Sequence, residues 1–395
     1  MLNSGVERRT DLVSLIFAVS EVWEESMVVT RFHGIDRHKN YSTVSVLDCE
    51  GHELQFVRSC SLSEYIGQLN IEDAVVLEAS CGSFYWADQI EETGARCFVL
   101  DPMRFRIITD SWNKTDRQDA RNMAKALWVF LVTGEFGIPT VYKPTETIRT
   151  LRRLFATYNL LNRQMRMLKN AVQAMMLEDG ISLSTSERTA LWNGRASVRE
   201  ILSEKNLSEV ILSAVEMQVA LLRNVKASKD QLSESILCAS APIADQVQLL
   251  VTIPGITPLT AAAFLADIGD IRRFKTARKM SAYLGLVPRC HDSGGTSHPG
   301  HITRESRKLS RTILTQSIYQ TVKGTPAWKR RYEELKSRRG AGRARIAMIR
   351  RLCTVMRRML LTGEKYYWLK EELYQLKLTR YQKTLEKAKK IQHAA

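Results

Sequence analysis

The stretch NKTDRQDARNMAKALWVFLVTG, residues 113–134, has the pattern of an amphipathic helix that begins at two acidic residues and ends at a glycine. Asp116 and Asp119 are about one helical turn apart, so both lie on one face of the helix. Acidic residues in a first turn offset the positive end of the helix dipole, and a helix start therefore explains the pair. A second interpretation is that the pair supplies half of a metal site. The rest of the chain decides between the two.

The segments before this helix predict a mixed sheet. Three runs that alternate like half-buried strands are joined by short turns and followed by helix, strand, helix and strand. The predicted strands are residues 28–36, 41–48, 52–60, 73–80 and 95–102, and the predicted helices are 62–70 and 84–94. With the closing helix this order is that of an α/β RNase H-like fold, in which the first and fourth strands are neighbours.

Beyond residue 143 the sequence predicts helices. Two long amphipathic runs, 147–177 and 207–236, predict an antiparallel coiled-coil arm that spaces domains or dimerises. The turn Pro254-Gly255-Ile256 predicts a helix-hairpin-helix-like element that can hold a phosphate, although a tight helical hairpin in a core has the same pattern. We expect five parts: an N-terminal extension 1–26, an α/β domain 27–143, a helical arm 144–246, a mostly helical domain 247–368 and an exposed basic tail 369–395.

The charge of the chain is unevenly distributed. Of 395 residues, the last 95 carry 25 Lys and Arg against 7 Asp and Glu, whereas the first 300 carry 33 against 35. A basic block on a near-neutral body indicates a polyanion partner, most simply a nucleic acid; the alternative is a solvated helical surface. Seven cysteines without a C-x-x-C pair fit a reducing cytosol, and no apolar run of about 18 residues predicts a membrane span. We expect a cytoplasmic protein.

Four carboxylates are placed where this fold would bring them together. Asp36 ends the first predicted strand, Glu78 lies near the end of the fourth, and Asp116 and Asp119 open the closing helix. Each alone has an ordinary explanation as a turn residue, a helix-approach residue or a cap. Together their repulsion needs a cation, and oxygen-only ligands favour Mg²⁺ or Mn²⁺. Two such ions, about 3.5–4 Å apart, would clamp both oxygens of a phosphoryl transfer.

A Gly-rich segment, HDSGGTSHPG at 291–300, contains hydroxyl groups that a flexible loop could present to a phosphate. Ser293 follows an aspartate and precedes two glycines. From the residues alone, Thr296 and Ser297 are equal candidates for a nucleophile, and a plain loop is the simpler interpretation.

Several motifs resemble those of the DEDD insertion-sequence transposases, the bridge-RNA-guided, serine-dependent recombinases related to Piv-type DNA invertases. They are GID at 34–36, LEASCGSFYW at 77–86, NKTDRQDA at 113–120, the run from IPGI to VPR at 253–289, and DSGGTS with GHIT at 292–303. The resemblance covers about residues 28 to 367. It implies a RuvC-like first domain in which Asp36, Glu78, Asp116 and Asp119 bind Mg²⁺, and a C-terminal transposase domain whose nucleophile is Ser293.

The same resemblance implies a reaction and its partners. Serine attack would give a covalent phosphoserine link to DNA, and strand exchange would follow through a junction. The implied partners are double-stranded donor and target DNA in the nucleoid, a guide RNA, and further copies of the chain as a dimer that assembles into a tetramer with a composite site. Predicted nucleic-acid contacts are Lys114, Arg304, Arg307, Lys308 and Arg311. The chain has Ser306 where the family pattern usually has glycine, which weakens the assignment of Arg311 and its neighbours.

We therefore predict an enzyme, a DNA transposase or site-specific recombinase. One alternative is a RuvC-like junction nuclease that uses only water and metal. The other is a nucleic-acid-binding protein without catalytic activity, against which the presence of all four carboxylates argues.

Overall fold

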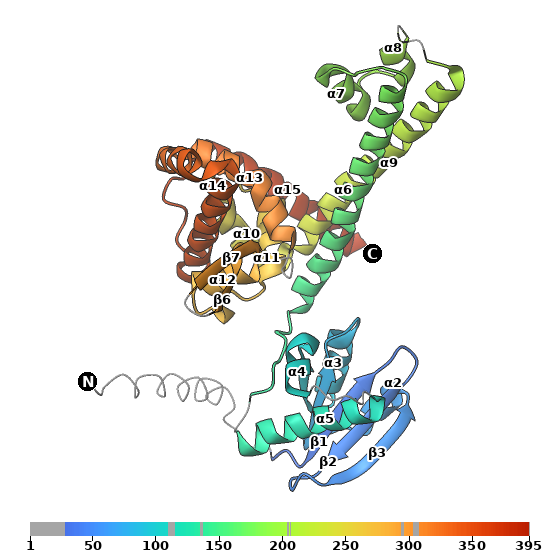
Figure 1. Cartoon of the computed structure of the whole chain (residues 1–395), viewed down its shortest axis with the longest axis vertical. Helices are drawn as coiled ribbons and strands as arrows, with labels where there is room; N and C mark the ends of the chain where they lie inside the picture. The colour runs from blue at the N-terminus through green and yellow to red at the C-terminus, as the bar shows by residue number, and fades with distance from the viewer. Residues whose placement is uncertain are drawn as a thin grey trace, which may run out of the picture. The chain divides into compact units, whose positions relative to one another are not determined.

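The computed structural model describes residues 28–109, 115–134, 137–203, 205, 207–293, 296–302 and 308–394. For 106–109, 289–293, 296–302, 308 and 388–394 it describes the backbone alone. The chain divides into two compact units, Met1–Lys143 and Pro144–Ala395, and each is described by itself (Figure 1).

Unit 1 is built on a five-stranded mixed sheet of order β3-β2-β1-β4-β5. Its strands are β1 (Arg31–Arg37), β2 (Ser42–Leu47), β3 (Glu53–Cys60), β4 (Asp73–Glu78) and β5 (Arg96–Leu100). The first three strands are antiparallel, whereas β4 pairs in parallel with both β1 and β5. The predicted strands and the predicted pairing of the first with the fourth are confirmed, and the strand order is compatible with an RNase H-like fold.

Helices cover both faces of this sheet (Figure 1). They are α2 (Leu62–Ile66), α3 (Ser83–Glu92), α4 (Pro102–Thr109) and α5 (Asp116–Trp128), which continues as the π-helical turn η1 (Val129–Thr133). Residues of α2 and α3 pack with Ile35 on one face, and residues of α4 and α5 pack with Phe32 on the other. The alternation of strand side chains thus divides the unit into two cores. Helix α4 was not predicted.

Asp73, the first residue of β4, ties the two central strands together. Its buried carboxylate accepts hydrogen bonds from Arg31 at 2.6 and 2.9 Å, from the Asn70 backbone at 2.7 Å, and lies 2.9 Å from His33 Nε2. Burial alone would raise the pKa of Asp73, but the hydrogen bonds from His33 and Arg31 lower it to about 2.

The helical arm opens unit 2. Its two long helices are α6 (Glu146–Glu178) and α9 (Glu209–Ala239), which pack along each other, with α7 (Thr185–Asn193) and α8 (Val198–Leu202) at the far end (Figure 1). Both long helices were predicted. The two short ones were not, although Ser184 and Ser197 each form a capping box with the glutamate three residues on.

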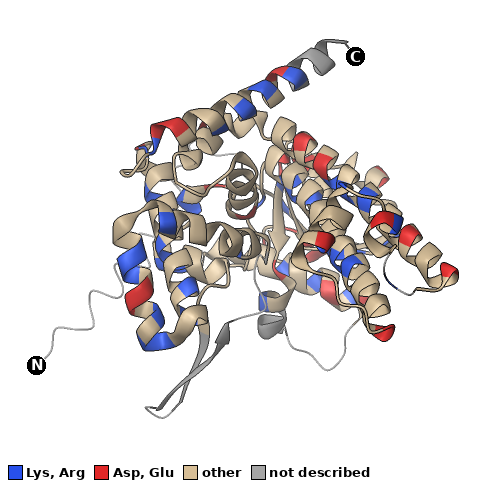
Figure 2. Ribbon diagram, turned by 90° about the horizontal axis from the view of Figure 1, so that it is seen from above, with Lys and Arg blue, Asp and Glu red and all other residues tan. Residues whose placement is uncertain are grey.

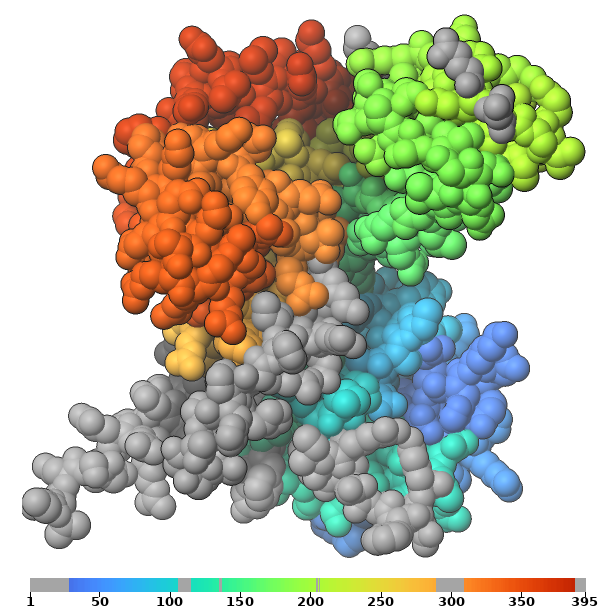
Figure 3. Space-filling model, turned by 45° about the horizontal axis from the view of Figure 1, so that its top comes forward, coloured from blue at the N-terminus to red at the C-terminus, as the bar shows by residue number. Residues whose placement is uncertain are grey.

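The remainder of unit 2, the yellow, orange and red parts of the chain in Figure 3, is mostly helical and shares one large core with the start of α6 and the end of α9. Its elements are η2 (Ala241–Ile243), α10 (Ala244–Val251), α11 (Pro258–Ile268), η3 (Ile271–Arg273), α12 (Ala277–Tyr283), β6 (Pro288–Ser293), β7 (Thr296–Ile302), α13 (Lys308–Gly324), α14 (Pro326–Thr362) and α15 (Glu371–Ala394). No helix in the described part of the chain is long and apolar enough to cross a membrane.

The predicted helical hairpin is present between α10 and α11, but its turn faces the protein. A Cβ added to Gly255 would lie 2.8 Å from the backbone nitrogen of Thr321 in α13. Lys377 of α15 donates hydrogen bonds to the carbonyl groups of Val251, Ile253 and Ile256 at 2.8, 3.1 and 2.9 Å. Of the two interpretations of this turn, the geometry favours the tight hairpin in a core.

The predicted basic tail is a helix with one face buried in the core, although most of its residues are exposed. Residues Glu371–Ala394 form α15, whose Tyr374 and Tyr381 are 8% and 1% exposed and belong to the core of unit 2. The Tyr381 hydroxyl group lies 2.8 Å from the hydroxyl group of buried Ser240. The many lysines of this segment concealed an apolar face at helical spacing.

Candidate metal site and nucleophile hairpin

The pleat of the sheet directs Asp36 and Glu78 to the face that α5 covers. Gly34 faces α5, and Asp36 follows it by two residues, so it lies on the same face. Val76 belongs to the core on that face, and Glu78 again follows by two. Because Ile35 pairs with Leu77 in the parallel ladder, the two acids lie at the same end of adjacent strands.

Gly34 determines how close the closing helix comes. A Cβ at this position would lie 2.1 Å from the carbonyl oxygen of Ala120 and 2.4 Å from the nitrogen of Ala124, so only glycine allows this approach. The Thr115 side chain accepts a hydrogen bond from the Gln118 backbone at 3.2 Å and caps the helix before its two acids. The glycine of the GID motif therefore seats the helix whose first turn carries Asp116 and Asp119.

The structure brings two of the four predicted carboxylates together and adds a histidine. One ligand atom each from Asp36, His38 and Asp116 lies within 4.8 Å of the others. His38 Nε2 is 3.2 Å from Asp36 Oδ2 and 3.2 Å from Asp116 Oδ2. The hydroxyl group of Tyr41 donates to Asp116 Oδ2 at 3.0 Å, and its ring stacks on His38 at 4.6 Å between centroids.

The electrostatics of Asp36 connect it to both acids of the helix. Burial raises the pKa of Asp36, the His38 side chain opposes this, and the negative charges of Asp116 and Asp119 raise it further. Asp119 is thus close enough to act on Asp36. Glu78 is placed by its strand and register, on the same face and at the same end.

This donor set fits a divalent cation. The carboxylate oxygens suit Mg²⁺ or Mn²⁺, and a cation would relieve the repulsion that raises the pKa of Asp36. The imidazole of His38 departs from the oxygen-only set that suits Mg²⁺ and Mn²⁺. His38 was not predicted as a site residue. The only indication in the sequence is that it follows Asp36 by two residues, just after the end of β1.

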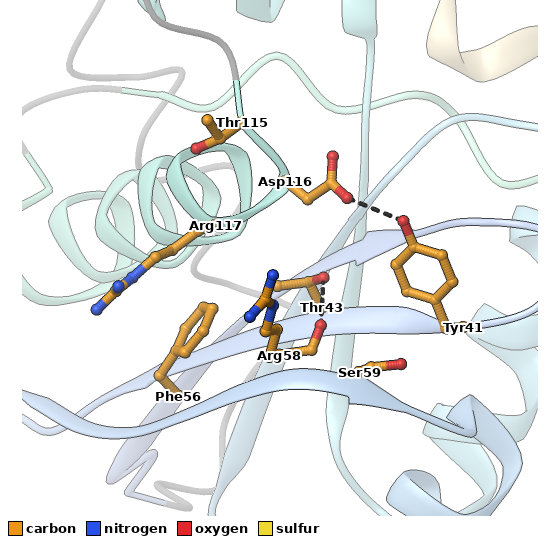
Figure 4. A pocket seen from close by; sticks show the side chains of 8 residues that line it. All are labelled: Tyr41, Thr43, Phe56, Arg58, Ser59, Thr115, Asp116 and Arg117. Carbon is orange, nitrogen blue, oxygen red and sulfur yellow. Dashed lines mark hydrogen bonds between the residues drawn. The ribbon is translucent and has the colours of Figure 1, made fainter.

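A cleft of about 1020 Å³ lies beside this cluster, between β2, β3 and the start of α5 (Figure 4). Asp116 and Tyr41 lie at one side of it, and Arg58 and Arg117 supply positive charge. The Arg117 guanidinium group lies 4.9 Å from the centre of the Phe56 ring. The cleft therefore offers cationic groups and an aromatic surface next to the carboxylates.

Ser293 lies in a β-hairpin of unit 2 and not in the flexible loop that the glycines suggested. It is the last residue of β6 and pairs with Thr296, the first residue of β7. Asp292 pairs with Ser297, the third candidate nucleophile. The backbone thus places all three hydroxyl-bearing residues at the end of one hairpin; their side chains lie outside the described part of the structure.

The predicted nucleic-acid contacts are only partly covered. Lys114, Arg304 and Arg307 lie outside the described residues, and Lys308 is described by its backbone alone, as the first residue of α13. Arg311 is half-buried and its Nη1 donates to the carbonyl group of Gly285 at 3.4 Å, which is a contact within unit 2.

Both units of the chain are similar in sequence to known transposases. Residues 247–333, which include the hairpin, match the profile described as the transposase IS116/IS110/IS902 family. A probable family 20 transposase of Pseudomonas aeruginosa is 26% identical over 331 residues, 81% of this chain and 90% of that protein. The transposase for insertion sequence element IS1111A of Coxiella burnetii is 25% identical over 379 residues, 92% of this chain and 98% of that protein.

A third relative, the transposase for insertion sequence element IS1328 of Yersinia enterocolitica, is 26% identical over 244 residues, 61% of this chain and 69% of that protein. The first two alignments cover most of this chain and most of each relative, and the carboxylate cluster and the hairpin both lie in this chain. Over most of its length the chain is thus distantly similar to transposases, and residues 247–333 match the IS116/IS110/IS902 family. The prediction of an enzyme of the transposase class is confirmed.

Proposed function

We propose that this transposase cuts and rejoins double-stranded DNA through a serine nucleophile, assisted by Mg²⁺ or Mn²⁺ and guided by a non-coding RNA. The observation that carries the proposal is the group of Asp36, His38 and Asp116, held within 4.8 Å at one end of the central strands of unit 1. The match of residues 247–333 to the transposase family supports the assignment of the second half of the site to the hairpin.

The carboxylates of unit 1 hold the cation in this proposal. Asp36 and Asp116 bind it directly, and Asp119 and Glu78 complete the set. When bound, such an ion polarises a phosphoryl oxygen and lowers the pKa of an attacking or leaving hydroxyl group. The Tyr41 hydroxyl group fixes the orientation of the Asp116 carboxylate through its hydrogen bond.

The cleft beside the cluster positions the DNA strand. Arg58 and Arg117 have no acidic partner within ion-pairing distance in the described part of the chain, so their charges are available for phosphates. Phosphate contacts of this kind position a duplex without reading its sequence. This division is consistent with a guide RNA that supplies sequence recognition by base pairing.

The covalent step belongs to Ser293. Its Oγ forms a bond to the scissile phosphorus while one bridging P–O bond breaks, and the proton of the serine hydroxyl passes to the departing sugar oxygen. The reverse reaction with the hydroxyl of a different strand rejoins the DNA and regenerates serine. Because the carboxylates lie in unit 1 and Ser293 in unit 2, we propose a composite site that two or more copies of the chain assemble, as a dimer or tetramer.

The test uses the full-length protein, duplex DNA from the flanks of its own gene, and RNA transcribed from the adjoining non-coding segment. Cleavage and covalent protein–DNA adduct are measured separately on denaturing gels. Ser293→Ala should lose both products, Asp116→Asn should lose both, and Thr296→Ala, on the opposite strand of the hairpin, should keep both. Omission of the RNA should abolish cleavage of the flanking duplex.

Three outcomes would contradict parts of the proposal. Cleavage that survives Ser293→Ala identifies the nuclease that uses water. Full activity of Asp116→Asn removes the metal site. Binding without any cleavage by the wild-type protein, with metal and RNA present, identifies a non-catalytic nucleic-acid-binding protein.

A further inference from the structure

A second hollow lies in unit 2, between α12 and α14, and is separate from the carboxylate cluster. We call it the basic groove. Its lining combines three arginines, Arg278, Arg350 and Arg351, with the small residues Ala277, Ser281 and Ala347. Ala277, Arg278 and Ser281 lie within the run 253–289, but none of the lining residues was predicted as a site residue.

In the described part of the chain, no ion pair offsets the positive charge of the basic groove. Arg278 and Arg350 are exposed and have no acidic partner in the described part of the chain, and Arg351 lies 5.7 Å from the centre of the Trp328 ring. Residues 335–363 contain nine Lys and Arg and no Asp or Glu, and α12 contains no acid either. Figure 2 marks Lys and Arg in blue and Asp and Glu in red on the helices. A groove with this potential attracts an anion.

The small residues let that anion come close. Ala347 precedes Arg350 by one helical turn on α14, and Ala277 adjoins Arg278 on α12. Each of these arginines therefore has a neighbour with a short side chain, which leaves room for a bound group. A phosphate group between the two helices can therefore contact arginines from both sides. The bidentate geometry of arginine suits such a contact.

The lining argues for the backbone of a duplex. Proteins that hold single strands stack the bases on aromatic side chains, and none of the described residues that line the basic groove is aromatic. Trp328, whose ring lies 5.7 Å from the Arg351 guanidinium group, is 1% exposed and belongs to the core. We infer that the basic groove binds the sugar-phosphate backbone of a nucleic-acid duplex through charge, without reading its bases.

The groove is also connected to the nucleophile hairpin. Helix α12 ends at Tyr283 and β6 begins at Pro288, so four residues separate them, and Arg311 of α13 donates to the carbonyl group of Gly285 in this connection. A duplex in the groove is thus held by the element that leads directly into the strand of Ser293. This inference rests on one part of the proposed function, namely that the protein binds nucleic acid.

The test is equilibrium binding of fluorescently labelled duplexes to the full-length protein, measured over a range of salt concentrations in EDTA. In EDTA no metal-dependent step contributes, so the result is independent of the proposed catalysis. For the double variant Arg278→Gln/Arg350→Gln, the slope of log K against log salt for duplex DNA should fall in magnitude by about 1.8, since each phosphate contact contributes about 0.9. The loss should be equal for duplexes of different sequence.

The matched control is Arg331→Gln/Arg338→Gln, which removes two charges from the same helix. Both arginines lie outside the groove and pair with Glu334, Arg331 at 2.8 Å and Arg338 at 3.7 Å. Their loss should leave the slope almost unchanged. A second pair separates charge from size: Ala347→Glu should weaken binding, whereas Ala347→Gln, of similar volume, should weaken it much less.

The nucleic acid is supplied as duplex DNA, as duplex RNA and as single strands of the same length. A loss confined to one of the duplexes identifies that duplex as the occupant of the groove and supports the inference. A groove variant that binds both duplexes like the control variant overturns the inference, and so does a loss confined to single strands. Circular dichroism melting of each variant checks that the fold is retained.

Discussion

At the scale of the residue, the carboxylate cluster depends on groups that hold its acids in place. Tyr41 donates to Asp116 at 3.0 Å and stacks on His38, which lies 3.2 Å from both Asp36 and Asp116. The proximity of Asp36 and Asp116 could be predicted from the sequence, because one lies at the end of a strand and the other begins a helix. His38 and Tyr41 could not, because their contacts with Asp116 span 78 and 75 residues of chain.

Tyr41→Phe removes the hydrogen bond to Asp116 and leaves the stacked ring in place. Because groups that orient metal ligands typically contribute 10- to 100-fold to affinity, we expect Mn²⁺ binding to weaken by about tenfold. Isothermal titration calorimetry with Mn²⁺ measures this. The control is Tyr85→Phe, on the exposed surface of α3, which should bind Mn²⁺ like the wild type. Equal affinities in all three proteins would show that Tyr41 does not orient a ligand.

Asp73 determines part of the acid stability of unit 1. Its pKa in the folded chain is about 2, below the ordinary value of 3.8, so the unfolded chain binds more protons between these values. Its contribution is therefore complete above about pH 4 and is lost as the pH falls towards 2. The shift corresponds to about 2 kcal/mol.

The variant Asp73→Asn isolates this contribution. We expect it to be less stable than the wild type by about 2–3 kcal/mol at pH 7, because Arg31 and His33 lose a charged acceptor. The difference should narrow as the pH falls from 4 to 2. Urea unfolding of both proteins at several pH values measures it, and a difference that stays constant with pH would exclude the ionised carboxylate as its source.

At the scale of the element, the close packing of α5 on β1 decides whether the acids meet. Gly34→Ala would place a Cβ 2.1 Å from the Ala120 carbonyl oxygen, and the helix has to move. Overpacking of this kind lowers the free energy of unfolding by about 1–3 kcal/mol. The protein should still fold, but the displacement of Asp116 and Asp119 should strongly reduce the rate of DNA cleavage.

The control for this variant is Gly137→Ala, because a Cβ at Gly137 meets nothing within 4 Å. Thermal unfolding and cleavage are measured for both variants. Cleavage at the wild-type level in a folded Gly34→Ala protein would show that the position of the helix is not critical for the site.

The turn between α10 and α11 depends on Lys377 of α15. Lys377 is half-buried, and its ammonium group donates to the carbonyl groups of Val251, Ile253 and Ile256. Lys377→Met keeps about the length of the side chain but leaves these carbonyl groups without this donor. We expect the free energy of unfolding of unit 2 to fall by about 2–3 kcal/mol. Lys383→Met, at an exposed position of the same helix, should be neutral. Equal stability of the two variants would contradict this role.

The elements show which parts of the fold the sequence can predict. Strands β1 to β5 and the two arm helices follow from local periodicity, and the predictions agree with the structure. Helix α15 was predicted as an exposed tail because its apolar face, with Tyr374 and Tyr381, is interrupted by lysines. The partner of that face is far away in the sequence, and composition alone does not show it.

At the scale of the whole molecule, the two units carry different halves of the proposed chemistry. The carboxylate cluster lies in unit 1, and the hairpin and the basic groove lie in unit 2. The excess of basic residues at the C-terminal end predicted a polyanion partner in general terms. It did not predict the groove, because the pairing of α12 with α14 depends on packing between segments about 70 residues apart.

Mass spectrometry of the trapped protein–DNA adduct shows whether Ser293 forms the covalent bond to DNA. Trypsin releases residues 290–304 as one peptide, which contains Ser293, Thr296 and Ser297. After nuclease digestion of the DNA, fragmentation of this peptide should place the residual nucleotide on Ser293, and the adduct should be absent from Asp116→Asn. A nucleotide on Thr296, on Ser297 or on any other residue would contradict the account, as would cleavage by the wild type without any adduct.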